Sequence, residues 1–203
     1  MAAGTSFGDA GSGAYELRFD SGRVCLDLLA TAHPDEHLSG TEPLRAWLKG
    51  AGLVPASTPL GLIDAGCATA FRELRDHIAE LVTDAPNLDG RPFDAALAHL
   101  NALAAGSPPA PRAVRTADGG LVRALHQDPG APALLAAVAR DAVELLTDPA
   151  ARSRIRQCEG DNCPIIYLDT SRGRRRRWCS SEICGNRERV ARHRRRAAAL
   201  ARV

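Results

Sequence analysis

The chain has 203 residues, of which 45% are hydrophobic, 25% charged and only 4% aromatic. This composition is typical of a globular protein and excludes collagen-like and wholly disordered chains. The formal net charge of +2 conceals an uneven distribution. Residues 1–149 carry 11 basic and 19 acidic side chains, whereas residues 150–203 carry 15 arginines and 5 acidic side chains. An acidic body followed by a basic tail indicates a polyanionic partner such as nucleic acid.

No segment is typical of a membrane or exported protein. The apolar run Pro132–Ala139 has eight residues, whereas about 20 are needed to cross a bilayer. Residues 1–14 are rich in Gly, Ala and Ser, and they lack the basic start and apolar stretch of a signal peptide. We therefore expect a flexible leader at residues 1–14 and a cytoplasmic protein.

The first predicted elements are short. Tyr15–Phe19 alternates apolar and polar side chains, which predicts a strand. The apolar segment Val24–Ala32 predicts a helix that ends at His33-Pro34. Thr41 is suited to cap the next helix, which we expect to stop at Gly52.

Three longer helices and a hairpin follow. Apolar residues recur three and four positions apart over residues 67–82, 92–105 and 132–147, which is the spacing of amphipathic helices. Asp118-Gly119 separates two β-prone runs within residues 112–126 and predicts a hairpin. The expected fold class is α+β, mainly α, with a helical domain at residues 15–150 and a small module at residues 151–203.

Four of the six cysteines gather in the small module as Cys158-x4-Cys163 and Cys179-x4-Cys184. Two close thiolates from each of two turns can meet at one tetrahedral metal ion, as in structural zinc sites. We expect one structural Zn²⁺ per chain, which would also hold together a segment too small to bury much surface. An iron–sulfur cluster is the alternative metal group, and disulfides or inert thiols are the alternatives without metal. Cys25 and Cys67 lie alone on apolar helix faces, where we expect small core residues.

The small module resembles the CGNR zinc finger, which is named after residues equivalent to Cys184-Gly185-Asn186-Arg187. The residues before it are similar to the ABATE domain, a family of stress-induced transcription regulators. That similarity rests on Phe19–Asp27 and on the Leu44–Leu53 helix, although Ala30 stands where the family pattern leads us to expect Asn. The resemblance implies a bacterial, zinc-dependent, DNA-binding transcription regulator that responds to stress.

Residues 181–202 can form one basic helix. Ile183, Val190 and Ala197 would share a stripe that packs on the finger, while arginines would occupy the opposite side. With the basic turn before Cys179, this helix supplies the candidate nucleic-acid contacts. They are Arg172, Arg174, Arg175, Arg176, Arg177, Arg187, Arg189, Arg192, Arg195 and Arg196. The opposite charges of body and tail suggest that the body masks this helix when DNA is absent.

No motif indicates catalysis, so we expect no enzyme. His33 to His37 brings two histidines and two carboxylates together, but we expect a surface loop rather than a second metal site. The preferred hypothesis is a regulator that binds double-stranded DNA, whose body senses a small-molecule effector or forms a homodimer. A zinc-stapled protein–protein adaptor and a thiol redox sensor are the alternatives.

Overall fold

The computed structural model describes residues 17–83 and 91–200. The helices are α1 (Val24–Ala30), α2 (Thr41–Gly50), α3 (Ala65–Thr83), α4 (Arg91–Ala104), α5 (Ala131–Thr147), α6 (Pro149–Arg152) and α7 (Cys184–Leu200). The strands are β1 (Pro111–Arg115), β2 (Leu121–Leu125), β3 (Ile155–Gln157) and β4 (Ile166–Leu168). The predicted α+β fold, mainly helical with a small β component, is confirmed.

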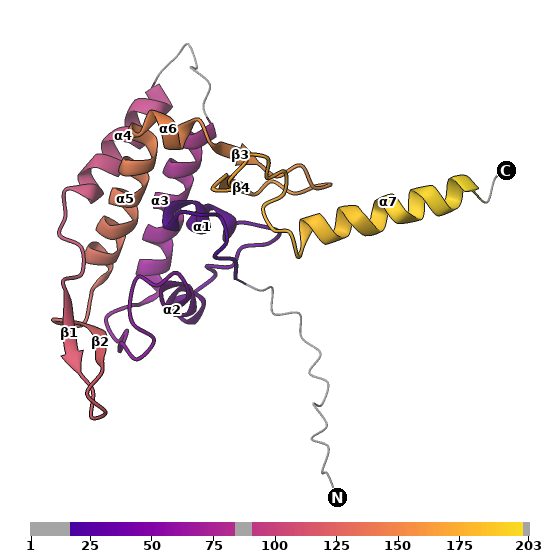
Figure 1. Ribbon diagram of the computed structural model, residues 1–203. Helices are drawn as coiled ribbons and strands as arrows, with labels where there is room; N and C mark the ends of the chain where they lie inside the picture. The colour runs from indigo at the N-terminus through magenta and orange to yellow at the C-terminus, as the bar shows by residue number, and fades with distance from the viewer. Residues whose placement is uncertain (1–16, 84–90, 201–203) are drawn as a thin grey trace, which may run out of the picture.

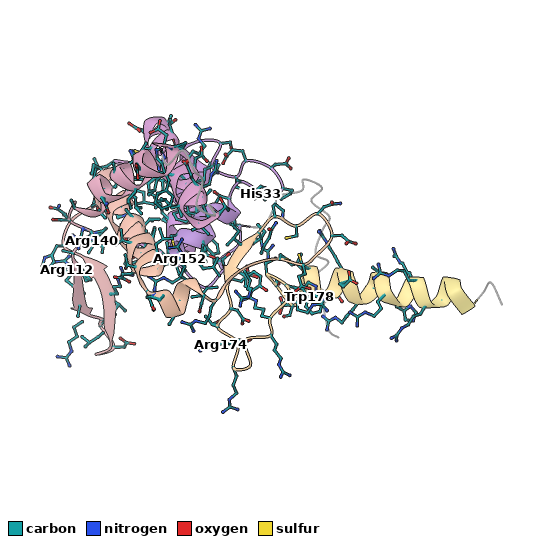
Figure 2. The ribbon with its side chains drawn as sticks, turned by 90° about the horizontal axis from the view of Figure 1, so that it is seen from above. His33, Arg112, Arg140, Arg152, Arg174 and Trp178 are labelled. Atoms are coloured by element: carbon teal, nitrogen blue, oxygen red, sulfur yellow. The ribbon has the colours of Figure 1, made fainter. Side chains whose placement is uncertain are left out.

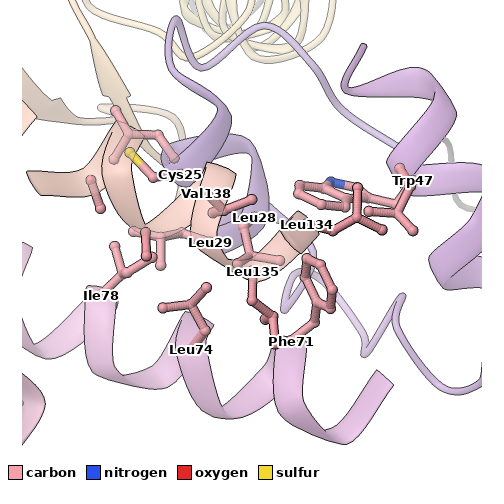
Figure 3. Packing of buried hydrophobic residues seen from close by; sticks show 14 of the residues in the cluster. Cys25, Leu28, Leu29, Trp47, Phe71, Leu74, Ile78, Leu134, Leu135 and Val138 are labelled. Carbon is pink, nitrogen blue, oxygen red and sulfur yellow. The ribbon is translucent and has the colours of Figure 1, made fainter. Parts of the chain in front are cut away.

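Helices α3, α4 and α5 pack side by side, and α1 lies against α3 and α5 (Figure 1). On α3 the residues Phe71, Leu74 and Ile78 are fully buried, because their spacing of three and four places them on one helix face. Phe71 meets Trp47 of α2 edge-on, with ring centroids 5.9 Å apart, and leucines of α1 and α5 complete this core (Figure 3). Two of the eight aromatic residues, Trp47 and Phe71, thus lie at the centre of the body's core.

The predicted hairpin is confirmed as β1 and β2, which pair antiparallel with Val114 opposite Val122. Gly119 turns the chain with a φ of +87°, in the region that glycine adopts at little cost. Both strands are mostly exposed, and the hairpin extends beyond the end of the helices (Figure 1).

A second antiparallel pair, β3 and β4, joins the C-terminal module to the helical body. Leu168 contributes to the body's core, and its amide donates to the carbonyl of Ser21 at 2.8 Å. The amide of Ser21 donates in turn to the buried carboxylate of Asp27 at 2.9 Å. The domain boundary near residue 150 stays a prediction. The contacts between Leu168 of the C-terminal module and Ser21 and Asp27 of the body connect the two parts, and we call this region the joint.

Several local predictions differ from the structure. The described part of the predicted first strand, Leu17–Phe19, is not a strand, and the carbonyl of the next residue, Asp20, accepts from Arg176 of the C-terminal module instead of from a neighbouring strand. Thr41 is the first residue of its helix, and Gly40 occupies the cap position. The basic helix begins at Cys184, since Ser181–Ile183 forms a turn before it, and Arg202 lies outside the described residues.

Truncating the centre of the core tests this arrangement. Phe71→Ala removes a fully buried ring that contacts Trp47 and is expected to lower the free energy of unfolding by about 3–5 kcal/mol. Leu62→Ala is the control, because Leu62 is 62% exposed, and its effect should stay within about 0.5 kcal/mol. Urea unfolding followed by circular dichroism measures both. Equal effects would contradict the assigned core.

Asp27 gives the joint a pH dependence. Burial raises the pKa of its carboxyl from 3.8 to about 6, although the bond from Ser21 opposes the rise. The folded state therefore holds this proton more tightly than the unfolded state, and stability falls as pH rises through 6. Relative to Asp27→Asn, the wild type should lose about 1 kcal/mol of unfolding free energy between pH 5 and pH 7. Urea unfolding at both values measures this loss, and a constant difference would refute it.

Candidate metal centre and basic surface

The four cysteines of the C-terminal module meet at one point. Cys158 follows β3, Cys163 precedes β4, Cys179 ends the basic loop and Cys184 begins α7. Their sulfur atoms all lie within 4.8 Å of one another, and three of the four residues are buried. The turn before α7 is held by Ser180, whose hydroxyl accepts from the amides of Glu182 and Ile183 at 3.3 Å each.

The spacing of the sulfurs fits a tetrahedral zinc site. A Zn–S distance of ~2.3 Å places the sulfurs of a regular tetrahedron about 3.8 Å apart. The sulfur of Cys179 lies 3.7 Å from that of Cys163 and 3.6 Å from that of Cys184. The cluster is therefore suited to binding one zinc ion, as the cysteine spacing predicts.

Electrostatics shows why these thiols need a cation. Burial, together with the neighbouring Cys163 and Cys158, raises the pKa of Cys184 to about 11, although the hydrogen bond with Cys179 lowers it. Burial also raises the pKa of Cys179 strongly. At Cys158 the amides of Cys179 and Gly160 donate to the sulfur at 3.3 and 3.4 Å, and these bonds outweigh burial and lower its pKa. A divalent ion at the centre would stabilise all four thiolates together.

Gly160 shows how closely the backbone approaches this centre. A Cβ atom at this position would lie 3.4 Å from the sulfur of Cys184 and 3.5 Å from that of Cys158. Its tightest contact would be with the Cβ atom of Cys184 at 3.3 Å, so a side chain here would press on that ligand residue.

Comparison with known families agrees with this geometry. Residues 22–149, more than half of the chain, match the ABATE family model, described as "Putative stress-induced transcription regulator". The chain belongs to the ABATE family. Residues 154–197 match the CGNR zinc finger, and these are the residues that contain the four-cysteine cluster. No curated protein matches the chain. Both family resemblances predicted from the sequence are thereby confirmed.

Arginines on two elements form a basic surface around the finger. The loop between β4 and Cys179 carries Arg174 at its tip, where the side chain extends away from the ABATE domain (Figure 2). Helix α7 projects from the finger into solvent (Figure 1). Nine of the ten predicted contact residues are exposed: Arg172, Arg174, Arg175, Arg177, Arg187, Arg189, Arg192, Arg195 and Arg196.

Arg176 is the exception, because its guanidinium binds protein groups. It donates to the carbonyls of Trp178, Asp20 and Cys179, and it lies 4.5 Å from the centre of the Tyr167 ring. The prediction that Arg176 faces nucleic acid is therefore at odds with its place between finger and body.

Helix α7 contacts the finger near its start, where Arg189 still donates to the carbonyl of Ser181 at 3.1 Å, and the predicted packing stripe is wrong beyond Ile183. Val190 is 43% exposed and Ala197 is exposed as well. Gly185 packs on the Trp178 ring, where a Cβ atom would lie 3.5 Å from a ring carbon. The helix also extends away from the ABATE domain rather than lying against it, which is the opposite of the masking that the charges suggest (Figure 1).

The histidines of the body occupy two places. The segment from His33 to His37 is a loop, as predicted, and Glu36 in it pairs with the buried Arg75 at 2.6 Å. His77 and His99 lie 22 positions apart in the sequence, but α3 and α4 bring their rings to a centroid distance of 4.5 Å. Among the described residues only the four finger cysteines form a cluster suited to a metal.

The two remaining cysteines differ in environment. Cys25 is completely buried in the core of the ABATE domain, where burial raises the pKa of its thiol. Cys67 is partly buried and its amide donates to Asp64 at 3.0 Å near the start of α3. No helix in the described part of the chain is both long and apolar enough for a membrane span.

Removal of one ligand tests the metal centre. Cys184→Ser leaves three thiolates and is expected to weaken zinc affinity at least tenfold, since even outer residues of metal sites contribute 10–100-fold. Zinc content per chain, measured by atomic spectroscopy after dialysis against a weak chelator, should fall well below one. Cys67→Ser is the matched control and should retain one zinc ion, because Cys67 lies outside the cluster. Equal zinc content in both variants would contradict the assignment.

Proposed function

We propose that this ABATE protein is a non-enzymatic transcription regulator that binds double-stranded DNA through its zinc finger and helix α7. One observation carries the proposal: a helix anchored at a metal site extends away from the body and exposes its arginines. Among the described residues, Arg187, Arg192 and Arg196 have no ion pair or side-chain hydrogen bond with the protein. Uncompensated arginines on an exposed helix are typical of an electrostatic footprint for nucleic acid.

The dimensions of α7 support duplex DNA as the ligand. Its 17 residues correspond to a rod of about 25 Å, and the major groove, about 12 Å wide, admits one α-helix. Arg189, Arg192 and Arg196 follow one another at intervals of three and four residues, so they line one face of this rod. That face can enter the groove or follow the phosphates along its edge.

The basic loop supplies a second contact next to α7. A groove of about 580 Å³ separates the loop from the start of the helix, and Arg175, Arg177 and Ser181 line it. Arg177 pairs with Glu159 at 2.6 Å and stacks beside Trp178, which fixes one wall of the groove. We expect the loop to bind the phosphate backbone and so to fix the orientation on the duplex, while α7 lies in or along the groove.

The ABATE domain would supply the regulatory half. Its helical core is large enough to respond to a small-molecule effector or to form a homodimer, and the family description supports a role under stress. The acidic ABATE domain would then respond to the signal, and the basic C-terminal module would bind the DNA.

Replacing the arginines of one helix face tests the proposal. The triple variant Arg189→Ala, Arg192→Ala, Arg196→Ala should lower duplex affinity at least tenfold at low salt. The slope of log affinity against log salt should become about three units shallower, since each phosphate contact contributes ~0.9. Gel shifts across a salt series measure both quantities.

The control variant carries the same change of charge elsewhere. Arg112 and Arg115 are exposed on the ABATE domain, and the exposed Arg152 lies just after it at the end of α6. Their joint replacement by alanine should leave the affinity within about twofold. A triple variant in α7 that behaves like this control would refute the assigned helix face. A zinc-loaded wild type without duplex affinity at low salt would favour the protein–protein adaptor instead.

A further inference from the structure

The zinc centre receives little stabilisation from its own finger. Four thiolates around one Zn²⁺ leave a net charge of −2, which outer donors must offset when the site is buried. Within the described residues, the backbone amides that reach a sulfur of the cluster are those of Gly160 and Cys179, and both donate to Cys158. The charge on the other sulfurs calls for a donor from elsewhere in the chain.

A short segment of the body, Leu17–Gly22, runs beside this centre, and we name it the strap. The finger binds the strap twice: Leu168 N–H donates to Ser21 O at 2.8 Å, and Arg176 donates to Asp20 O at 3.0 Å. Gly22, with a φ of +88°, is so close to Leu168 that a Cβ atom would lie 3.3 Å from it. The backbone of the strap is therefore fixed between the body and the finger.

The strap places one cation at the zinc site. Arg18 is only 15% exposed, although arginine is seldom buried without a partner. It lines a cavity of about 240 Å³ together with Cys163 and Cys184. Its link to Asp20 is long at 3.3 Å, and its buried Nε has no hydrogen-bond partner among the described residues.

Cys179 completes the surroundings of Arg18. Burial lowers the pKa of Arg18, but the Cys179 thiolate and Asp20 raise it by more, so the guanidinium stays charged. The charged guanidinium therefore lies in the cavity that Cys163 and Cys184 also line, next to two of the four zinc ligands.

We propose that Arg18, a residue outside the finger, is a positioning residue of the zinc centre: its guanidinium offsets the charge of the tetrathiolate and ties the strap to the metal. The zinc site is then completed by the N-terminal part of the chain. Zinc binding and docking of the finger on the ABATE domain consequently stabilise each other. This inference does not depend on DNA binding.

Zinc release from the full-length, zinc-loaded protein tests the proposal. Arg18→Met keeps the length of the side chain but removes its charge, and it should accelerate transfer of zinc to an excess of chromophoric chelator about tenfold. Arg18→Lys retains the charge and should restore the rate to within about threefold of the wild type. Arg152→Met, an exposed arginine outside the strap, is the control and should stay within twofold.

A second measurement distinguishes loosening of the strap from unfolding of the whole protein. Amide hydrogen exchange of Ser21 and Leu168 should become faster in Arg18→Met, and faster still when zinc is removed from the wild type, while exchange in the core of α3 stays unchanged. The proposal is overturned if Arg18→Met releases zinc within twofold of the wild-type rate. It is also overturned if Arg18→Lys releases zinc as fast as Arg18→Met, or if Arg152→Met matches that rate.

Discussion

Four sulfur atoms within 4.8 Å of one another set the constraint on which the C-terminal module of this protein depends. Burial raises the pKa of two of these thiols, Cys179 and Cys184, and so opposes their ionisation. A divalent ion would stabilise the thiolates against this effect of burial and would hold the four chain segments that carry them at one point. The position of β4, the exposure of the basic loop and the direction in which α7 begins all follow from this single centre.

The sequence predicts features that depend on local spacing. The amphipathic helices of the body, the Asp118-Gly119 hairpin and the zinc spacing of Cys158, Cys163, Cys179 and Cys184 are each specified by residues near one another in the chain. The structure confirms these features because the residues that determine each of them lie close together in the sequence.

Features that depend on distant partners were not predictable in this way. The strand β3 is three residues long and exists because Ile166–Leu168 lies beside it. Arg176 resembles its basic neighbours in sequence, yet contacts with Asp20 and Tyr167 make it part of the joint. The start of the strap has the alternating pattern of a strand but forms none, and the carbonyls of Asp20 and Ser21 accept from the finger instead. In each case the deciding contact joins residues that no local pattern connects.

The joint between strap and finger has a consequence for the order in which the molecule assembles. The bond from Arg176 to Asp20 spans 156 residues. Contacts of such long range form slowly and late, because a long loop must close before they contribute. A ribosome releases Leu168 and the four cysteines after the helical body, so the body can fold before the strap meets its partner. Binding of the metal would then follow the folding of the body.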